Sequence, residues 1–113
     1  MYIHFVYMKG IILKDTICFD WDKGNKYKNW ISHEVTWKEA EEAFYDEKRI
    51  IFEDVKHSKI EKRYILFGEI KGGGKLFIAF TMRGKHEEMI RIISARTLKR
   101  KEAKIYEKTV GIA

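Results

Sequence analysis

The chain has 113 residues, which is enough for one domain and too short for two independent ones. Charged residues make up 35% of it and the formal net charge is +6, so the expected partner is a polyanion such as RNA or DNA, or an acidic protein. The single cysteine, Cys18, excludes an intramolecular disulfide, and no stretch approaches the roughly 18 apolar residues of a membrane span, so we expect a reducing cytoplasm and no membrane partner.

The first segment, residues 1–15, is rich in apolar and aromatic side chains. His4 and Lys9 interrupt it, and no small-residue cleavage site follows, so it lacks the pattern of a signal peptide. We interpret it as an N-terminal extension or an extra strand of a single domain that spans residues 1–113. Met8 is a second candidate start site within it.

A short strand and two helices are predicted next. Apolar and polar residues alternate over 17–22, and a helix is expected to begin near Asp22. The apolar face of this helix contains Tyr27, Trp30 and Ile31. The second helix has a clearer start, because Thr36 and Glu39 form a T-x-x-E capping box that satisfies free backbone N–H groups. Its apolar stripe contains Trp37, Ala40, Ala43 and Phe44, and core packing is the expected role of the tryptophans on both stripes.

From Arg49 the pattern becomes extended and predicts a meander of about four strands. The predicted strands cover 50–52, 63–70, 76–83 and 89–95, with a Lys71-Gly72-Gly73-Gly74 turn between the second and the third. Side chains of alternating position should face the helices: Tyr64, Leu66, Ile70, Leu76, Ile78, Phe80, Met82, Ile90 and Ile92. Arg63, Arg83 and Arg91 would then share the open face, unless a strand slips by one residue.

Residues 98–108 complete the chain with a helical composition and three large apolar anchors, Leu98, Ile105 and Tyr106, so this helix should lie on the surface. The predicted fold class is therefore α+β. N-terminal helices pack on one face of a twisted, mainly antiparallel sheet of about four to five strands, and a C-terminal helix follows.

The run 90–96 has the apolar pattern of a buried strand but carries Arg91 and Arg96. Four further basic residues, Lys99, Arg100, Lys101 and Lys104, follow closely, so positive charge gathers around one C-terminal unit. This pattern indicates phosphate binding. The alternative is structural: the arginines would pair with Glu61, Glu69 or Glu102, and the lysine-rich run would be a solvated helix face or a docking surface for an acidic partner.

Several short motifs occur in a specific order along the chain: Phe19-Asp20-Trp21-Asp22, Asn29 with His33, Val35 to Ala40, Phe44 and Asp46, Glu61-Lys62-Arg63-Tyr64, Gly68, Ile90 to Arg96, Glu102 and Tyr106. In this order and spacing the chain resembles the BrnT family of type II toxin–antitoxin systems, which are ribonuclease toxins with a RelE-like α+β fold. Two departures stand out. The family commonly has Lys-His-Gly where this chain has Ser32-His33-Glu34, and it usually starts close to the Trp-Asp element.

The resemblance implies RNA cleavage that blocks translation, and neutralisation by a cognate antitoxin of the BrnA type that contacts operator DNA as part of the complex. Ribonucleases of this shape can work without metal. A base removes the ribose 2′-hydroxyl proton, the oxygen attacks the adjacent phosphate, cations stabilise the developing charge, and an acid protonates the leaving oxygen. The expected products are a 2′,3′-cyclic phosphate and a 5′-hydroxyl, and no cofactor or metal is expected.

The chain supplies residue types for each of these roles. The catalytic candidates are His33, Glu61, Arg63, Arg91, Arg96 and Tyr106, and the RNA-binding candidates are Arg83, Lys99, Arg100 and Lys104. Other roles remain open, since His33 could cap its helix, Glu61 could pair with Arg63 across a loop, and Tyr106 could anchor a helix. The spacing of His4, His57 and His86 relative to other residues gives no reason to choose any of them as a catalytic residue. The alternative function is a non-catalytic, basic nucleic-acid-binding module or an inactive toxin-like partner.

Overall fold

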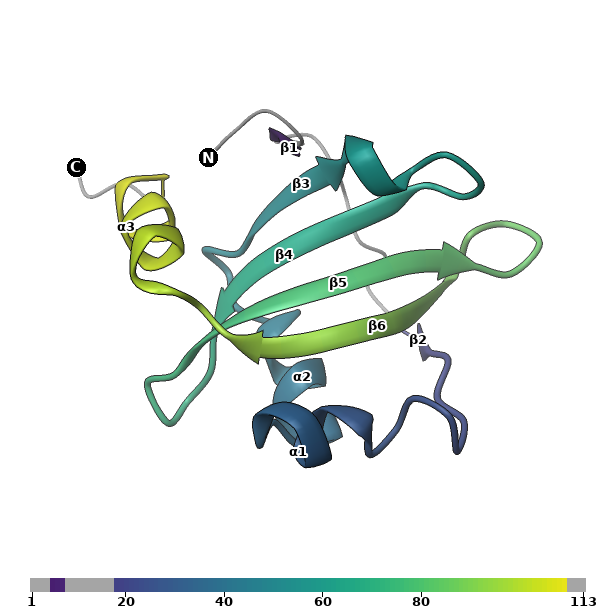
Figure 1. Ribbon diagram of the computed structural model, residues 1–113, viewed down its shortest axis with the longest axis horizontal. Coiled ribbons are helices and arrows are strands. Elements are labelled where there is room, and N and C mark those ends of the chain that lie inside the picture. The colour runs from purple at the N-terminus through teal and green to yellow at the C-terminus, as the bar shows by residue number, and fades with distance from the viewer. Residues whose placement is uncertain (1–4, 8–17, 110–113) are drawn as a thin grey trace.

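The computed structural model describes residues 5–7 and 18–109 of the chain (Figure 1). Its elements, in chain order, are β1 (Phe5–Tyr7), β2 (Cys18–Phe19), α1 (Lys28–His33), α2 (Trp37–Ala43), β3 (Ile50–Asp54), the short 3-10 helix η1 (Val55–His57), β4 (Arg63–Glu69), β5 (Lys75–Arg83), β6 (Met89–Thr97) and α3 (Arg100–Thr109). Strand β1 falls within the segment that the sequence suggested as an extension or an extra strand.

The described strands form one mixed sheet in the order β1-β3-β4-β5-β6-β2. Strands β3 to β6 are an antiparallel meander, β1 pairs antiparallel with β3, and β2 pairs parallel with β6. Figure 1 shows α1 and α2 together on one side of this sheet and α3 beyond the end of β6. The predicted α+β class is confirmed. The strand number exceeds the prediction because two very short strands extend the edges.

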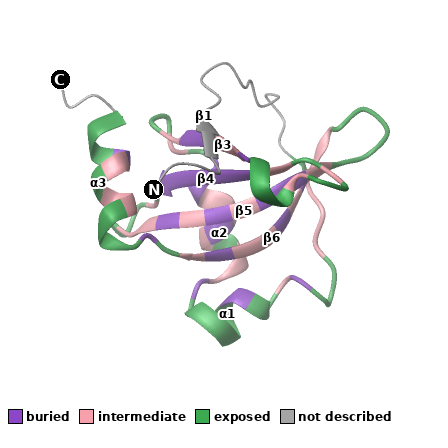
Figure 2. Cartoon of the chain, turned by 45° about the horizontal axis from the view of Figure 1, so that its top comes forward, coloured by how far each residue is buried: buried purple, intermediate pink, exposed green. Residues whose placement is uncertain are grey.

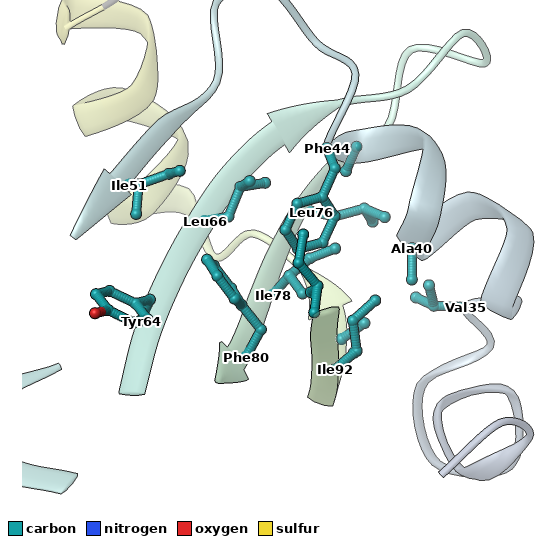
Figure 3. Close-up of a cluster of buried hydrophobic side chains, with 13 residues drawn as sticks. Val35, Ala40, Phe44, Ile51, Tyr64, Leu66, Leu76, Ile78, Phe80 and Ile92 are labelled. Carbon is teal, nitrogen blue, oxygen red and sulfur yellow. The ribbon is translucent and has the colours of Figure 1, made fainter. Parts of the chain in front are cut away.

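The main core lies between α2 and the sheet face that the alternation predicted. Side chains from α2 and from the meander point toward one another there (Figure 3). Phe44, directly after α2, is fully buried and packs edge-on against Phe80 with ring centroids 5.0 Å apart. The capping box predicted at the start of α2 is present in full, since the Thr36 hydroxyl accepts from the Glu39 N–H and the Glu39 carboxylate accepts from the Thr36 N–H.

The close approach of α2 to β4 depends on Gly68. A Cβ atom added at this position would lie 2.5 Å from the backbone carbonyl oxygen of Ala43, far inside van der Waals contact. Because the neighbouring atom belongs to the backbone, no side-chain rotation could relieve the clash. Gly68 therefore sets the distance between the helix layer and the sheet.

The first helix differs from the prediction. It begins at Lys28 rather than near Asp22, because the Asp22 carboxylate accepts hydrogen bonds from the N–H groups of Gly24 and Asn25 and holds a turn instead. The expected apolar face is also wrong, since Tyr27, Trp30 and Ile31 are 57%, 53% and 81% exposed. Figure 2 shows exposed residues along much of α1.

Buried amides attach this region to the edge of β6 in place of an apolar face. The Asn29 side-chain oxygen accepts from the Ala95 N–H at 2.9 Å, and the Asn25 side-chain nitrogen donates to the Ile92 carbonyl at 3.1 Å. Lys28 also donates to the carbonyl of Ile93 at 2.7 Å. Strand β2 pairs only with the start of β6, so these side chains satisfy edge groups that a longer strand would have paired.

Candidate functional site

Three arginines lie on the sheet face opposite α1 and α2, as the sequence predicted. The prediction that this face is open holds only in part, because α3 covers its other end, where Ile65 and Phe67 are buried. The strand register places Arg63 opposite Thr81 and Thr81 opposite Arg91, while Arg83 lies two residues further along β5 on the same face. We call Arg63, Arg83 and Arg91 the arginine row. Since neighbouring strands are about 4.8 Å apart, the backbones of Arg63 and Arg91 are about 10 Å apart.

A β-bulge in β6 decides where Arg96 points. Phe80 pairs with Ile92 and Ala79 pairs with Ser94, so Ile93 is an extra residue on β6. The insertion shifts the alternation by one, so Arg96, which pairs with Phe77, lies on the same face as Arg91 although the two are an odd number of residues apart. Without the bulge, Arg96 would point toward the core.

Arg91 is held by two carboxylates from the segment after β2. Its guanidinium lies 2.9 Å from an oxygen of Asp22 and 3.4 Å from an oxygen of Asp20. The hydrogen bond from Arg91 lowers the pKa of Asp22, and the same bond raises the pKa of Arg91. Arg91 therefore forms structural ion pairs, as the alternative interpretation expected, but its partners are Asp20 and Asp22 and not the glutamates that the sequence suggested.

Glu61 pairs with Arg83 rather than with Arg63. The Arg83 guanidinium donates two hydrogen bonds to the Glu61 carboxylate, at 3.0 and 3.2 Å. These bonds, followed by the nearby charge of Arg83, lower the pKa of Glu61, so the group stays ionised and is a poor proton donor. In the part of the chain that the structure describes, Arg63 forms no ion pair, and its charge acts on Glu61 only at longer range.

The loop between β3 and β4 forms a hollow beside the arginine row. It has a volume of about 350 Å³ and is lined by Lys56, His57, Lys59, Ile60, Glu61 and Arg63. Figure 2 shows this loop as largely exposed. His57, which the sequence did not favour, therefore lies with two of the predicted catalytic residues. The D-x-x-H spacing of Asp54 and His57 was the available signal, because it brings the two side chains together across one turn.

A second group of candidates surrounds α3. Arg96 donates two hydrogen bonds to Glu102, at 2.8 and 2.9 Å, and its guanidinium stacks 3.9 Å from the centre of the Phe77 ring. Burial tends to raise the pKa of Glu102, but the hydrogen bonds from Arg96 and from the Lys99 N–H outweigh it and lower the pKa. The predicted RNA-binding residues Lys99, Arg100 and Lys104 are exposed here.

Tyr106 belongs to this second group and docks α3. Its ring is buried, and its hydroxyl donates to the Asp46 carboxylate at 2.6 Å. Burial, followed by that carboxylate, raises the pKa of Tyr106. A hydroxyl that is already donating and that resists deprotonation is a structural anchor in this conformation.

His33 lies apart from both groups. It is exposed at the end of α1, and in the described residues it makes no hydrogen bond or ion pair with another candidate. The next residue, Glu34, ends the helix in the left-handed conformation with φ of 56°. The six catalytic candidates are therefore divided: Glu61, Arg63 and Arg91 lie at the arginine row, Arg96 and Tyr106 lie near α3, and His33 lies on α1.

The described residues show no sign of two other classes of site. No three histidine, cysteine, aspartate or glutamate side chains come together in a way that could hold a metal ion. No helix in residues 18–109 is long and apolar enough to cross a bilayer.

Comparison with known proteins identifies the family. The model described as "Ribonuclease toxin, BrnT, of type II toxin-antitoxin system" matches residues 21–102, whereas comparison with curated proteins gives no match. The matched region includes α1, α2, the whole meander and the start of α3, and hence the arginine row and the hollow beside it. Because the match covers most of the chain, the protein belongs to the BrnT family of ribonuclease toxins of type II toxin–antitoxin systems.

Proposed function

We propose that this chain is a cytoplasmic endoribonuclease that cleaves RNA without a metal ion and thereby inhibits translation. The family supports a ribonuclease toxin, and the arginine row is the observation that supports a phosphate site on this chain. Its guanidinium groups lie on one open face, and Arg63 has no carboxylate bound to it among the described residues. A free arginine next to two immobilised ones suits a phosphodiester, which needs charge stabilisation from more than one direction.

In the proposed reaction, the ribose 2′ oxygen attacks the neighbouring phosphorus, and negative charge builds on the two non-bridging oxygens. Arg63 would donate hydrogen bonds to these oxygens, while Arg83 and Arg91, which their carboxylates hold in place, would offer their remaining N–H groups as fixed donors. Glu61 orients Arg83. The products are a 2′,3′-cyclic phosphate and a 5′-hydroxyl.

The exposed basic residues near α3 support a further part of the proposal. Lys99, Arg100 and Lys104 would contact the RNA backbone or an acidic surface of a cognate BrnA-type antitoxin, with operator DNA bound only through that antitoxin. Contacts of this kind release counterions, so binding should weaken steeply as salt concentration rises. Arg96 would act mainly by fixing the start of α3 through Glu102.

The test is cleavage of end-labelled single-stranded RNA by the purified chain with EDTA present. We expect cleavage to cyclic-phosphate ends, and a loss of roughly 10²- to 10³-fold in rate for Arg63→Ala, the size typical of removing one transition-state hydrogen-bond donor. Lys38→Ala, at an exposed position of α2, is the matched charge-removal control and His33→Ala tests the isolated histidine. If free RNA is not cut, the assay is repeated with translating ribosomes, and absence of cleavage in both refutes the proposal.

One observation favours a second candidate function. Arg83, Arg91 and Arg96 are all bound by carboxylates, which lowers the net positive charge that the open face offers to RNA. A non-catalytic nucleic-acid-binding module or an inactive toxin-like partner would fit that arrangement. Such a module would bind RNA in a salt-sensitive way and leave the labelled strand intact at every enzyme concentration.

A further inference from the structure

A histidine–aspartate pair lies where β3 ends and η1 begins, outside the predicted catalytic candidates. The Nδ1 atom of His57 lies 2.8 Å from Oδ2 of Asp54, and Asp54 is only 7% exposed. A carboxylate can only accept hydrogen bonds, so the proton of the neutral imidazole must be on Nδ1. This leaves the lone pair of Nε2 available, and in the described part of the chain no group donates to it.

Backbone contacts hold this pair in a fixed relation to the arginine row. The Ser58 hydroxyl donates to the carbonyl of Asp54 at 2.7 Å and accepts from the N–H of Arg63 at 3.0 Å. The Asp54 carboxylate also accepts from the N–H of His57, which closes η1. Ser58 thus links the end of β3 to the start of β4 through two hydrogen bonds, and these bonds fix the position of His57 relative to Arg63.

The hollow in front of His57 has the chemistry of a phosphodiester site. Lys56, Lys59 and Arg63 contribute three positive charges to its walls, and the only carboxylate among its lining residues, Glu61, is already neutralised by Arg83. Ile60 is fully exposed at the same hollow and offers an apolar surface on which a base could pack. The volume of the hollow, about 350 Å³, lies within the range of small-ligand sites.

We propose that His57, oriented by Asp54, is the general base of the reaction and that this hollow binds the scissile phosphate. The inference rests on the proposed ribonuclease function. Nε2 of His57 takes the 2′-hydroxyl proton, the 2′ oxygen bonds to phosphorus, and the bond from phosphorus to the 5′ oxygen breaks. The leaving oxygen takes a proton from water, and the imidazolium returns its proton to the hydroxide so formed. Asp54 is a positioning residue, because it acts through the ring.

The first experiment measures RNA cleavage by His57→Gln, with His86→Gln as the control. His86 is exposed in the loop between β5 and β6, so its substitution removes one imidazole without touching the hollow. We expect His57→Gln to lose roughly 10²- to 10⁴-fold in kcat, the usual contribution of a general base, and His86→Gln to keep the parent rate. Asp54→Asn should lower kcat and leave KM near the parent value, because it disturbs the ring orientation and not the phosphate contacts. Full activity in folded His57→Gln, with the parent active, overturns the inference and leaves the proposed function intact.

A second measurement does not depend on turnover. The ring nitrogen resonances of His57 are followed by NMR while a dinucleotide with a 2′-deoxy group, which cannot be cleaved, is added. We expect the Nδ1-protonated tautomer in the free protein, and a change at Nε2 that follows the dinucleotide concentration and is absent in Arg63→Ala. An unchanged His57 ring in an active parent overturns the placement of the phosphate, whereas a changed ring in a parent that cuts neither free nor ribosome-bound RNA overturns both catalytic proposals.

Discussion

Replacing Asn29 with alanine tests the finding that a buried amide attaches α1 to the sheet. Asn29 is only 3% exposed, and its side-chain oxygen accepts from the N–H of Ala95, which is itself fully buried. The substitution leaves this N–H without a partner and without access to water. An unsatisfied buried donor costs about 1–3 kcal/mol. Alanine forms helices better than asparagine and regains about 0.5 kcal/mol, so we expect the free energy of unfolding to fall by about 0.5–2.5 kcal/mol.

The measurement is urea unfolding followed by circular dichroism, together with hydrogen exchange at the Ala95 amide. For a chain of this size the expected loss corresponds to about 2–10 °C in melting temperature. Ser32→Ala is the control, because Ser32 is on the same helix but exposed. If Asn29→Ala stays within about 0.5 kcal/mol of this control and the Ala95 amide keeps its protection, the anchoring role of the amide is refuted.

Three further predictions concern the scaffold. Gly68→Ala should lower the free energy of unfolding by about 1–3 kcal/mol, because its Cβ would meet the Ala43 carbonyl; Gly72→Ala, where nothing lies within 4 Å, should be near neutral in the same thermal melts. Glu34→Gly should raise the melting temperature by relieving the left-handed backbone, worth up to about 1 kcal/mol, and a fall would contradict this reading of the helix end. The pKa of Glu102 is lowered in the folded state, so the stability it contributes is fully present above its ordinary value of 4.5 and is lost as pH falls through the folded value. Parent stability should therefore drop more steeply in acid than that of Glu102→Gln when urea midpoints are compared from neutral pH to about pH 3, and parallel profiles would exclude the ion pair as the cause.

The arginine row could be predicted because strand alternation is a local property. Apolar side chains at every second position of β4, β5 and β6 leave Arg63, Arg83 and Arg91 on the other face, and the register confirms it. The capping box of α2 is equally local, since both of its residues lie within one turn. The family resemblance was also visible in the sequence, because the order of short motifs survives without knowledge of the fold, and the family match confirms it.

The partners of the charged residues could not be predicted in this way. Arg91 pairs with Asp20 and Asp22, about 70 positions earlier in the chain, because β2 lies parallel to β6. The orientation of Arg96 depends on a β-bulge at Ile93, and no local sequence pattern predicts that bulge. Either feature follows from how distant segments meet.

By itself, the sequence determined the α+β class, the sheet meander, the inward and outward faces of its strands, and the family. These follow from periodicity, capping and motif order, which act over a few residues at a time. Only the tertiary structure decided that amide side chains anchor α1 and that the aromatic residues of this region are exposed. It also decided that three arginines are bound by carboxylates and that His57 and Arg63 line one hollow. The physical reason is that edge hydrogen bonds, ion pairs and hollows form between segments far apart in the chain, so their partners exist only once the sheet has assembled.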